Sequence, residues 1–360
     1  MAAPPAERLA VTTTLATARE VPAPRGATLE DRLAAFLAAK MGTAVRVLDL
    51  ARRSGGGSRE TWMFTAEWRE EGEARQRPLV LRRDPPASLL DSDREREFRV
   101  LERLQGSGIP VPDVAWFERT PVWLDRPFMI MGRAPGMPTP PTFPSGADPA
   151  QRARAADDFV RILAAIHRLD WRRSGLEFLP GLDEAAPPAL VQLEEWRRLY
   201  ATERLAHEPL LDLAFRRLEE SLPECDQVTL VHGDFRTGNY LIDEHGHITA
   251  MLDWEMAHLG DPMEDLGWAC MDFWSGGGRA CGLLDREDLF ARYTAASGIA
   301  VDRRRVAFYE LLGDVKMTII SMTGLRSLVD GRAADVVLAY VGFLIPRLLR
   351  SIAQRLGVVA

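Results

Sequence analysis

The feature that most constrains the fold of this chain is a set of polar residues around a predicted β-hairpin. The tripeptide His-Gly-Asp at 232–234 precedes the hairpin, and Asn239 lies directly before its first strand. Strands are expected at residues 240–242 and 248–252, because two apolar runs flank a polar turn that contains glycine. Asp253 follows the second strand. Since the strands are antiparallel, the hairpin should bring Asn239 and Asp253 side by side at one end.

This spacing is typical of the catalytic loop of a kinase. Four residues separate Asp234 from Asn239, as in the protein-kinase loop. Phosphoryl transfer needs a carboxylate that accepts the proton of the attacking hydroxyl, and Asp234 offers one. Asn239 and Asp253 offer the oxygen ligands that Mg²⁺ prefers. His-Gly-Asp alone is a short string, and an aspartate before a turn often only caps it. The hypothesis therefore depends on the second aspartate and on features nearer the N terminus.

The composition argues against several classes of protein. The chain has 360 residues, which is enough for two lobes and a large core. Its formal net charge of −7 argues against a general nucleic-acid or anionic-membrane surface, and no apolar run is long enough to span a membrane. Three cysteines without metal-ligand spacing indicate a reducing compartment, so we expect a cytoplasmic protein. The oligomeric state cannot be deduced from the sequence.

Hydrophobic periodicity predicts the elements of secondary structure. Strands are expected, besides the hairpin, at 45–50, 61–68, 79–82, 114–118 and 127–131. Helices are expected at 29–40, 93–104, 151–169, 189–206, 209–221, 262–274, 286–297, 302–328 and 333–356.

These elements divide the chain into four predicted segments. Residues 1–28, rich in alanine and proline, are expected to be a disordered lead-in. Residues 29–131 form a small β-rich N-lobe on the nucleotide-phosphate side, and residues 132–150 form a hinge and linker rich in glycine and proline. Residues 151–360 form a helical C-lobe with the catalytic loop and the acceptor pocket. The predicted fold class is α+β, with the bilobal plan of a protein kinase.

A glycine-rich turn joins the first two predicted strands. It consists of Gly55, Gly56, Gly57 and Ser58. Backbone amides without a neighbouring Cβ can approach phosphate groups closely, so the turn is a candidate for nucleotide binding. The turn matches neither the Walker loop nor the G-x-G-x-x-G pattern, and a simple flexible turn is the alternative.

Arg82 and Glu97 are a candidate ion pair on the nucleotide side. Arg82 ends the third strand, where the kinase template has a lysine that holds phosphates, although an exposed strand-end arginine is the alternative. Glu97 lies on the apolar stripe of its helix with Leu101 and Leu104, at i+4 and i+7. A buried carboxylate needs a cationic partner, and Arg82 is the obvious one, although Arg83 is adjacent.

Together, these residues resemble the aminoglycoside phosphotransferase and choline kinase superfamily, which has a protein-kinase-like fold. Within it, they resemble the kinase-like domains related to those fused to acyl-CoA dehydrogenases, where Leu-Arg replaces the usual lysine. The resemblance covers about residues 50–270. It is carried by segments in the family's order: 54–58, 80–82, 96–98, 127–131, 163–170, 232–239, 253–255, 260–262 and 265–266.

The resemblance implies roles for the residues of the motif. It implies ATP and Mg²⁺ as cofactors, with Asp234 as the catalytic base and with Asn239 and Asp253 as metal ligands. On the nucleotide side it implies that Arg82 contacts phosphate and that Glu97 holds it.

The resemblance also implies an adenine pocket. Met131, Arg133 and their neighbours would line it through backbone groups. Gly132 departs from the family, because many relatives carry an acidic residue at this hinge position.

Four polar residues near the motif are expected to be structural. They are expected to orient backbone or to start helices, and they are His167, His232, Asp261 and Asp265.

The predicted function is ATP-dependent transfer of the γ-phosphoryl group to a hydroxyl of a small molecule. The alternative is a nucleotide-binding pseudokinase with a regulatory or scaffolding role, because Arg82 replaces lysine. A protein Ser/Thr kinase is disfavoured, because residues 260–262 follow Asp253 too closely for a long activation segment. The acceptor pocket is expected among helices after residue 150, with four candidates: Asp272, Trp274, Asp314 and Lys316. The sequence does not identify the acceptor.

Overall fold

The chain is described by a computed structural model that covers residues 26–53, 60–84, 94–183, 185–275, 278–332 and 336–359. Gly55, Gly56, Gly57 and Ser58 lie outside the described residues, as does most of the predicted lead-in. The chain divides into two compact units. Unit 1 comprises Met1–Pro85 and Asp113–Arg133, and unit 2 comprises Pro86–Pro112 and Ala134–Ala360.

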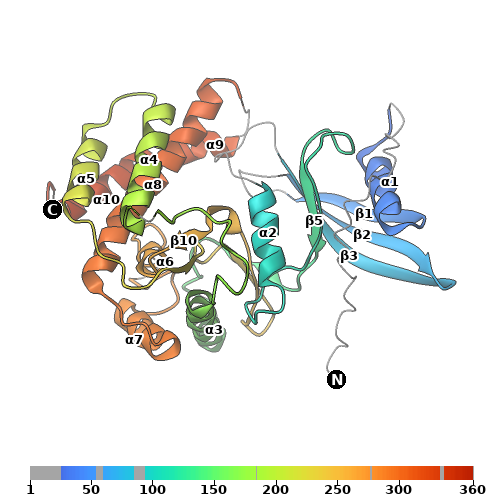
Figure 1. The fold of residues 1–360 in the computed structure, drawn as a ribbon, viewed down its shortest axis with the longest axis horizontal. Coiled ribbons are helices and arrows are strands. Elements are labelled where there is room, and N and C mark those ends of the chain that lie inside the picture. Colours follow the sequence, from blue (N-terminus) through green and yellow to red (C-terminus); the bar gives the residue numbers. More distant parts are fainter. Residues whose placement is uncertain are drawn as a thin grey trace. The chain divides into compact units, whose positions relative to one another are not determined.

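Unit 1 is an antiparallel sheet with one helix packed on it (Figure 1). In sheet order, the strands are β1 (Val45–Arg53), β2 (Glu60–Glu70), β3 (Glu73–Arg83), β5 (Phe128–Gly132) and β4 (Val114–Glu118). The helix α1 (Leu29–Met41) begins with a capping box between Thr28 and Asp31. Its buried residues Leu33, Phe36 and Leu37 complete a core with the inner faces of the strands.

Unit 2 contains the remaining elements. They are α2 (Arg94–Leu104), β6 (Met137–Pro138), α3 (Pro149–Arg168), α4 (Pro188–Glu203), α5 (Pro209–Glu220), β7 (Thr229–Val231), β8 (Tyr240–Ile242), β9 (Ile248–Met251), η1 (Trp254–Met256), β10 (His258–Gly260), α6 (Met263–Ala269), α7 (Arg286–Ser297), α8 (Arg303–Val329), α9 (Val336–Gly342) and α10 (Ile345–Arg355). The long helix α8 is central, since α4, α5, α6, α9 and α10 all pack against it (Figure 1). No described helix is long and apolar enough to cross a membrane.

The predicted fold class is confirmed: the structure is α+β, with a β-sheet in the N-terminal region and a helical C-terminal region. Two details were predicted wrongly. The single helix expected at 333–356 is two helices, because Pro346 lies in the first turn of α10 and cannot continue a preceding helix. The helix expected at 262–274 ends at Ala269.

Three short strands in unit 2 were not predicted, namely β6, β7 and β10. β7 and β10 pair in antiparallel fashion, with Val231 opposite His258. β7 and β10 have three residues each and β6 has two, which is too short for a period of two to be recognised. This pair matters for the site, because β7 leads directly into the His-Gly-Asp tripeptide at 232–234.

The helix α2 belongs to unit 2, although the sequence placed it in the N-lobe. A guanidinium nitrogen of Arg94 lies 3.4 Å from a carboxylate oxygen of Glu255, and Arg96 donates to the backbone oxygen of the same residue. These contacts tie α2 to η1. The predicted boundaries of the lobes at residues 131 and 150 stay predictions.

Candidate active site

The β8–β9 hairpin brings the backbone of Asn239 next to that of Asp253. Tyr240 pairs with Met251, and the N–H of Leu252 donates to the carbonyl oxygen of Asn239 at 2.8 Å. Asp253 is the next residue and has a left-handed backbone, with φ of 64°. The predicted hairpin is thus confirmed, and the chain turns sharply at Asp253 to begin η1.

Both carboxylate oxygens of Asp234 are held by hydrogen-bond donors. Oδ1 accepts from Nε1 of Trp268 at 2.7 Å and from Nε of Arg236 at 2.8 Å. Oδ2 accepts from Nδ2 of Asn239 at 2.5 Å. The guanidinium of Arg236 lies over the ring of Trp274, 4.2 Å from its centroid. The carboxylate is therefore fixed in position while remaining partly accessible, since its side chain is 16% exposed.

The side chains of Asn239 and Asp253 fit the requirements of Mg²⁺. The amide nitrogen of Asn239 donates to Oδ2 and to the backbone oxygen of Asp234, which leaves Oδ1 of Asn239 as an oxygen that could bind a metal. Asp253 adds a carboxylate. Within the described ranges there is no group of three or more His, Cys, Asp or Glu that could hold a metal. Two such oxygen donors would suit Mg²⁺, which usually keeps waters and substrate phosphates as its other ligands.

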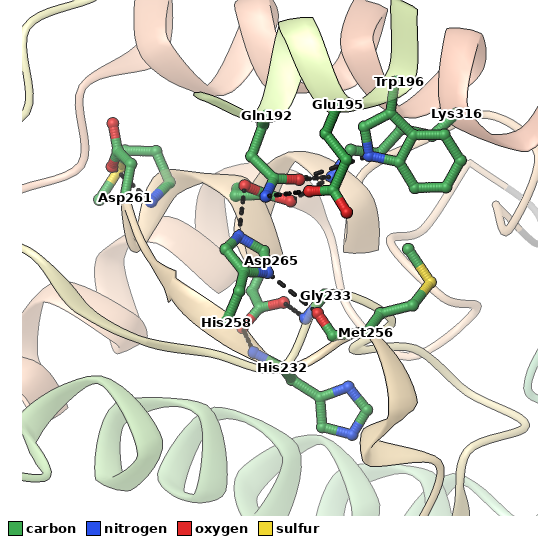
Figure 2. A network of polar contacts seen from close by, with 12 residues as sticks. Gln192, Glu195, Trp196, His232, Gly233, Met256, His258, Asp261, Asp265 and Lys316 are labelled. Carbon is green, nitrogen blue, oxygen red and sulfur yellow. Dashed lines mark hydrogen bonds and ion pairs between the residues drawn. The ribbon is translucent and has the colours of Figure 1, made fainter. Parts of the chain in front are cut away.

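Asp265 braces the backbone that carries Asp234. Its oxygens accept hydrogen bonds from the N–H of His232 at 2.8 Å and of Gly233 at 2.9 Å (Figure 2). Nε2 of His167 lies 3.1 Å from the same carboxylate. Burial alone would raise the pKa of Asp265, but these hydrogen bonds outweigh it, so the pKa is lowered. The carboxylate therefore stays charged and fixes the loop, in agreement with the structural role expected for Asp265.

His232 connects the two ends of the motif. Its Nδ1 accepts from the N–H of Asp234 at 3.2 Å, and its Nε2 lies 3.0 Å from the carbonyl oxygen of Leu252. One nitrogen accepts and the other donates, so the buried imidazole is the neutral Nε2–H tautomer. His232 orients backbone, as the sequence predicted.

The backbone conformation and the neighbouring backbone allow only glycine at position 233. Its φ is +82°, and a Cβ at this position would lie 2.5 Å from the carbonyl oxygen of Met256. The loop at residues 232–234 and the last residue of η1 thus touch through backbone, without room for a side chain.

Replacing Asp265 with asparagine should lower the free energy of unfolding by about 2–4 kcal/mol. The amide NH₂ would face the N–H donors of the loop and could satisfy only part of the three hydrogen bonds. Urea unfolding measures the change. Asp285→Asn is the control, because that side chain is 77% exposed and should change stability by less than about 0.5 kcal/mol. Equal stability of the two variants would contradict the proposed brace.

The residues predicted on the nucleotide side lie partly in unit 1. Arg82 is in β3, opposite Thr61 and Met129. Glu97 is buried on α2, which confirms that this carboxylate is on the inner face of its helix. The pairing of Arg82 with Glu97 stays a prediction.

Part of the backbone of the predicted hinge already forms hydrogen bonds within unit 1. Met131 is buried in β5, and the N–H of Arg133 donates to the carbonyl oxygen of Pro78 at 3.1 Å. A contact from Arg133 to adenine would therefore use its carbonyl oxygen. Asp113 fills the side-chain space of Gly132, where a Cβ would lie 2.0 Å from its Oδ1. The adenine-binding role of these residues stays a prediction.

Sequence reasoning missed two residues that contact Asp234. The contact of Arg236 could have been predicted from the sequence, because a cation two residues after a candidate base lies close to that base in a turn. Trp268 had none, since it is 34 residues away and reaches Asp234 only through the packing of α6.

The four acceptor candidates do not form one cluster. Asp272 is largely exposed, Trp274 lies against Arg236, and Asp314 is bonded to Ser351 and Arg355. Burial raises the pKa of Asp314 to about 6, although Arg355 opposes it. Lys316 lies elsewhere, in a buried network with Glu264 and Gln192 (Figure 2). Asp261 caps the start of α6 and binds Arg305, a structural role as predicted.

The curated relatives of this chain include members of the acyl-CoA dehydrogenase family. Acyl-CoA dehydrogenase family member 10 of Mus musculus is 32% identical over 202 residues, which are 55% of this chain and 18% of that protein. Acyl-CoA dehydrogenase family member 11 of Homo sapiens is 30% identical over 200 residues, 54% of this chain and 25% of that protein. The chain thus spans a quarter or less of the length of these two curated relatives.

Solved structures show the same fold at lower identity. A candidate aminoglycoside phosphotransferase from Ralstonia eutropha has a TM-score of 0.69 and 23% identity, with 90% of this chain and 97% of that chain covered. A thermostable mutant of aminoglycoside phosphotransferase APH(4)-Ia, in a ternary complex with AMP-PNP and hygromycin B, has a TM-score of 0.58 and 21% identity, with 89% and 98% covered.

A family model extends the match over most of the chain. The model of the phosphotransferase enzyme family matches residues 49–309, which extend from within β1 into the first turns of α8 and include every residue of the motif. The chain therefore belongs to the phosphotransferase enzyme family and has the kinase-like fold of aminoglycoside phosphotransferases.

Proposed function

We propose that this protein is an ATP-dependent kinase that transfers the γ-phosphoryl group to a hydroxyl of a small molecule. The observation that carries the proposal is the fixed carboxylate of Asp234, held through both oxygens by Trp268, Arg236 and Asn239. Such a group can orient an acceptor hydroxyl without reorganising, and positioning is the main contribution of a protein to phosphoryl transfer.

Each residue of the motif has a role in the proposed reaction. Asn239, through Oδ1, and Asp253, through its carboxylate, would hold Mg²⁺, which neutralises negative charge on the nucleotide phosphates when bound. Asp234 orients the acceptor hydroxyl and accepts its proton while the oxygen bonds to the γ-phosphorus and ADP leaves. Arg236 is a positioning residue, because it holds Oδ1 of Asp234 and is itself fixed over Trp274.

The nucleotide side of the proposal rests on the sequence. Arg82 would contact phosphate with Glu97 holding it, and the turn of Gly55 to Ser58 would cover the phosphates. Backbone groups of Met131 and Arg133 would line the adenine pocket. Structures of the same fold support nucleotide use, since one contains AMP-PNP with hygromycin B and another contains ADP with spectinomycin.

Replacing Arg236 with glutamine should lower kcat by about 10- to 100-fold and leave the Kd for Mg²⁺–ATP nearly unchanged. The reason is that Asp234 loses one of the donors that fix it. Arg236→Lys should recover little activity, because lysine lacks the planar fork that donates to Asp234 while lying over Trp274. Steady-state kinetics with the active acceptor measure both effects. A raised KM with unchanged kcat would contradict a role in positioning the base.

Release of ADP by the purified protein tests the proposed function. The protein is incubated with Mg²⁺–ATP and with aminoglycosides, choline, sugars, homoserine and hydroxyacyl compounds in turn. We expect one acceptor class to stimulate ADP release and EDTA to abolish it. Binding of Mg²⁺–ATP without turnover on any acceptor would favour the pseudokinase, for which the replacement of lysine by Arg82 is the supporting feature. Absence of nucleotide binding would exclude both the kinase and the pseudokinase.

A further inference from the structure

The guanidinium of Arg236 is held in place beside the carboxylate of Asp234 by three contacts. Its Nε donates to Oδ1 of Asp234 at 2.8 Å, and its Nη1 donates to the carbonyl oxygen of Thr237 at 3.0 Å. Its central carbon lies over the ring of Trp274, 4.2 Å from the centroid. The side chain is 17% exposed, so a bound molecule can reach a cation whose position is already set.

One nitrogen of this guanidinium is unused. Nη2 donates to no residue in the parts of the chain that the structure describes. A guanidinium is planar, and Nε–H and one N–H of Nη2 are the two parallel prongs with which it grips a carboxylate or a phosphate. Asp234 occupies only the Nε prong. The Nη2 prong therefore points into the space beside Oδ1 of Asp234, where it can donate to an oxygen of a bound molecule.

The proposed reaction brings phosphoryl oxygens close to this space. A base lies about 2.6–3.2 Å from the oxygen whose proton it accepts. That acceptor oxygen bonds to the γ-phosphorus, its proton passes to Asp234, and the bond from phosphorus to the bridging oxygen of ADP breaks. The three other oxygens of the phosphoryl group are attached to the same phosphorus, so they pass beside the carboxylate of Asp234 and the free prong.

The charge of Arg236 becomes available when the phosphoryl group is transferred. Three side chains contact the carboxylate of Asp234, and among these described contacts Arg236 is the one cation, beside Trp268 and Asn239. Before the reaction the negative charge of Asp234 offsets it. Once Asp234 has accepted the proton of the acceptor, the carboxyl is neutral and the guanidinium is left without its counter-charge. A cation that is already fixed in place stabilises negative charge there without reorganising.

We infer that Arg236 is a catalytic residue whose Nη2 donates to the phosphoryl group during its transfer, in addition to holding Asp234. The contact strengthens in the transition state, because proton transfer to Asp234 releases the positive charge of Arg236. The inference rests on the proposed function and adds a second catalytic group to it.

A transition-state analogue tests this contact without an acceptor. Fluoroaluminate binds next to Mg²⁺–ADP in phosphotransfer sites and imitates the transferring phosphoryl group. Isothermal titration of the whole protein with Mg²⁺–ADP, with and without fluoroaluminate, gives two Kd values for each variant. We expect fluoroaluminate to tighten ADP binding by the original protein at least about tenfold, and by Arg236→Gln less than about threefold. Without fluoroaluminate the two proteins should bind ADP equally well to within about threefold, which shows that the variant is folded.

Two control variants separate the proposed contact from other losses. Trp268→Phe removes the other donor to Oδ1 of Asp234 but keeps Arg236, so the tightening by fluoroaluminate should remain. Arg216→Gln removes an exposed arginine of α5 and should behave as the original protein does. Arg236→Lys repeats the test should the glutamine variant fail to fold. It should also lose the tightening, because one ammonium lacks the two parallel prongs that hold Asp234 and the phosphoryl group together.

Three results of this titration would overturn the inference. They are equal tightening in Arg236→Gln and the original protein, an equal loss in Trp268→Phe, and no tightening in the original protein. With an acceptor that proves active, a raised KM for Arg236→Gln with unchanged tightening by fluoroaluminate would place Arg236 against the acceptor instead. Failure of the proposed function is distinguishable, since it appears as absence of ADP release with every acceptor.

Discussion

The Asp234→Asn variant is expected to lose about 10²- to 10⁴-fold in kcat while its Kd for Mg²⁺–ATP stays within about threefold of the original. Asparagine keeps the size of the side chain but cannot accept the proton of the acceptor hydroxyl. Its NH₂ group would also face a donor, because both oxygens of Asp234 now accept hydrogen bonds from Trp268, Arg236 and Asn239. Steady-state ADP release and equilibrium nucleotide binding measure the two quantities separately.

The Trp268→Phe variant is the matched control for this experiment. It removes one donor to Asp234 but leaves the carboxylate, so kcat should fall by only about tenfold or less. Full activity of Asp234→Asn would remove Asp234 from the reaction. Loss of nucleotide binding in Asp234→Asn would instead indicate that the loop had rearranged. Nucleotide binding by Trp268→Phe would then show whether loss of the Trp268 contact is enough to cause this rearrangement.

The Lys316→Met variant is expected to lose about 3–5 kcal/mol of unfolding free energy. Methionine fills most of the space of the lysine stem, but the carboxylate of Glu264 stays buried without the ammonium that pairs with it. The chain has only two lysines, so Lys40→Met is a natural control. Lys40 is partly exposed, lies 3.8 Å from Glu118, and should contribute less than about 1 kcal/mol. Urea unfolding of both variants makes the comparison.

The pH dependence of stability distinguishes the ion pair from simple packing. Burial would raise the pKa of Glu264, but Lys316 and His258 outweigh it and lower the pKa from 4.5 to about 2. A depressed carboxyl pKa stabilises the fold above pH 4.5, and this contribution is lost as the pH falls toward 2. The difference in stability between the original protein and Lys316→Met should therefore shrink over this range. A difference that is constant with pH would mean that lost packing explains the effect.

The centre of the site could be predicted from the sequence because its geometry is local. A turn between two apolar runs fixes the hairpin, and an antiparallel hairpin necessarily brings Asn239 next to the residue that follows its second strand. Glu97 was correctly placed on a buried face by the same kind of argument, since a helix repeats every 3.6 residues. Errors arose where one residue interrupts a periodic pattern, as Pro346 does between α9 and α10.

The sequence by itself thus determined the fold class, the hairpin and the position of the three motif residues along the chain, because turn chemistry and periodicity act over a few residues. Only the tertiary structure placed Trp268 against Asp234, Asp265 under the loop, and Lys316 against Glu264, which is 52 residues away in the chain. The physical reason is that a buried charge or donor needs some partner, but the sequence does not state which distant residue packing will bring within hydrogen-bond distance.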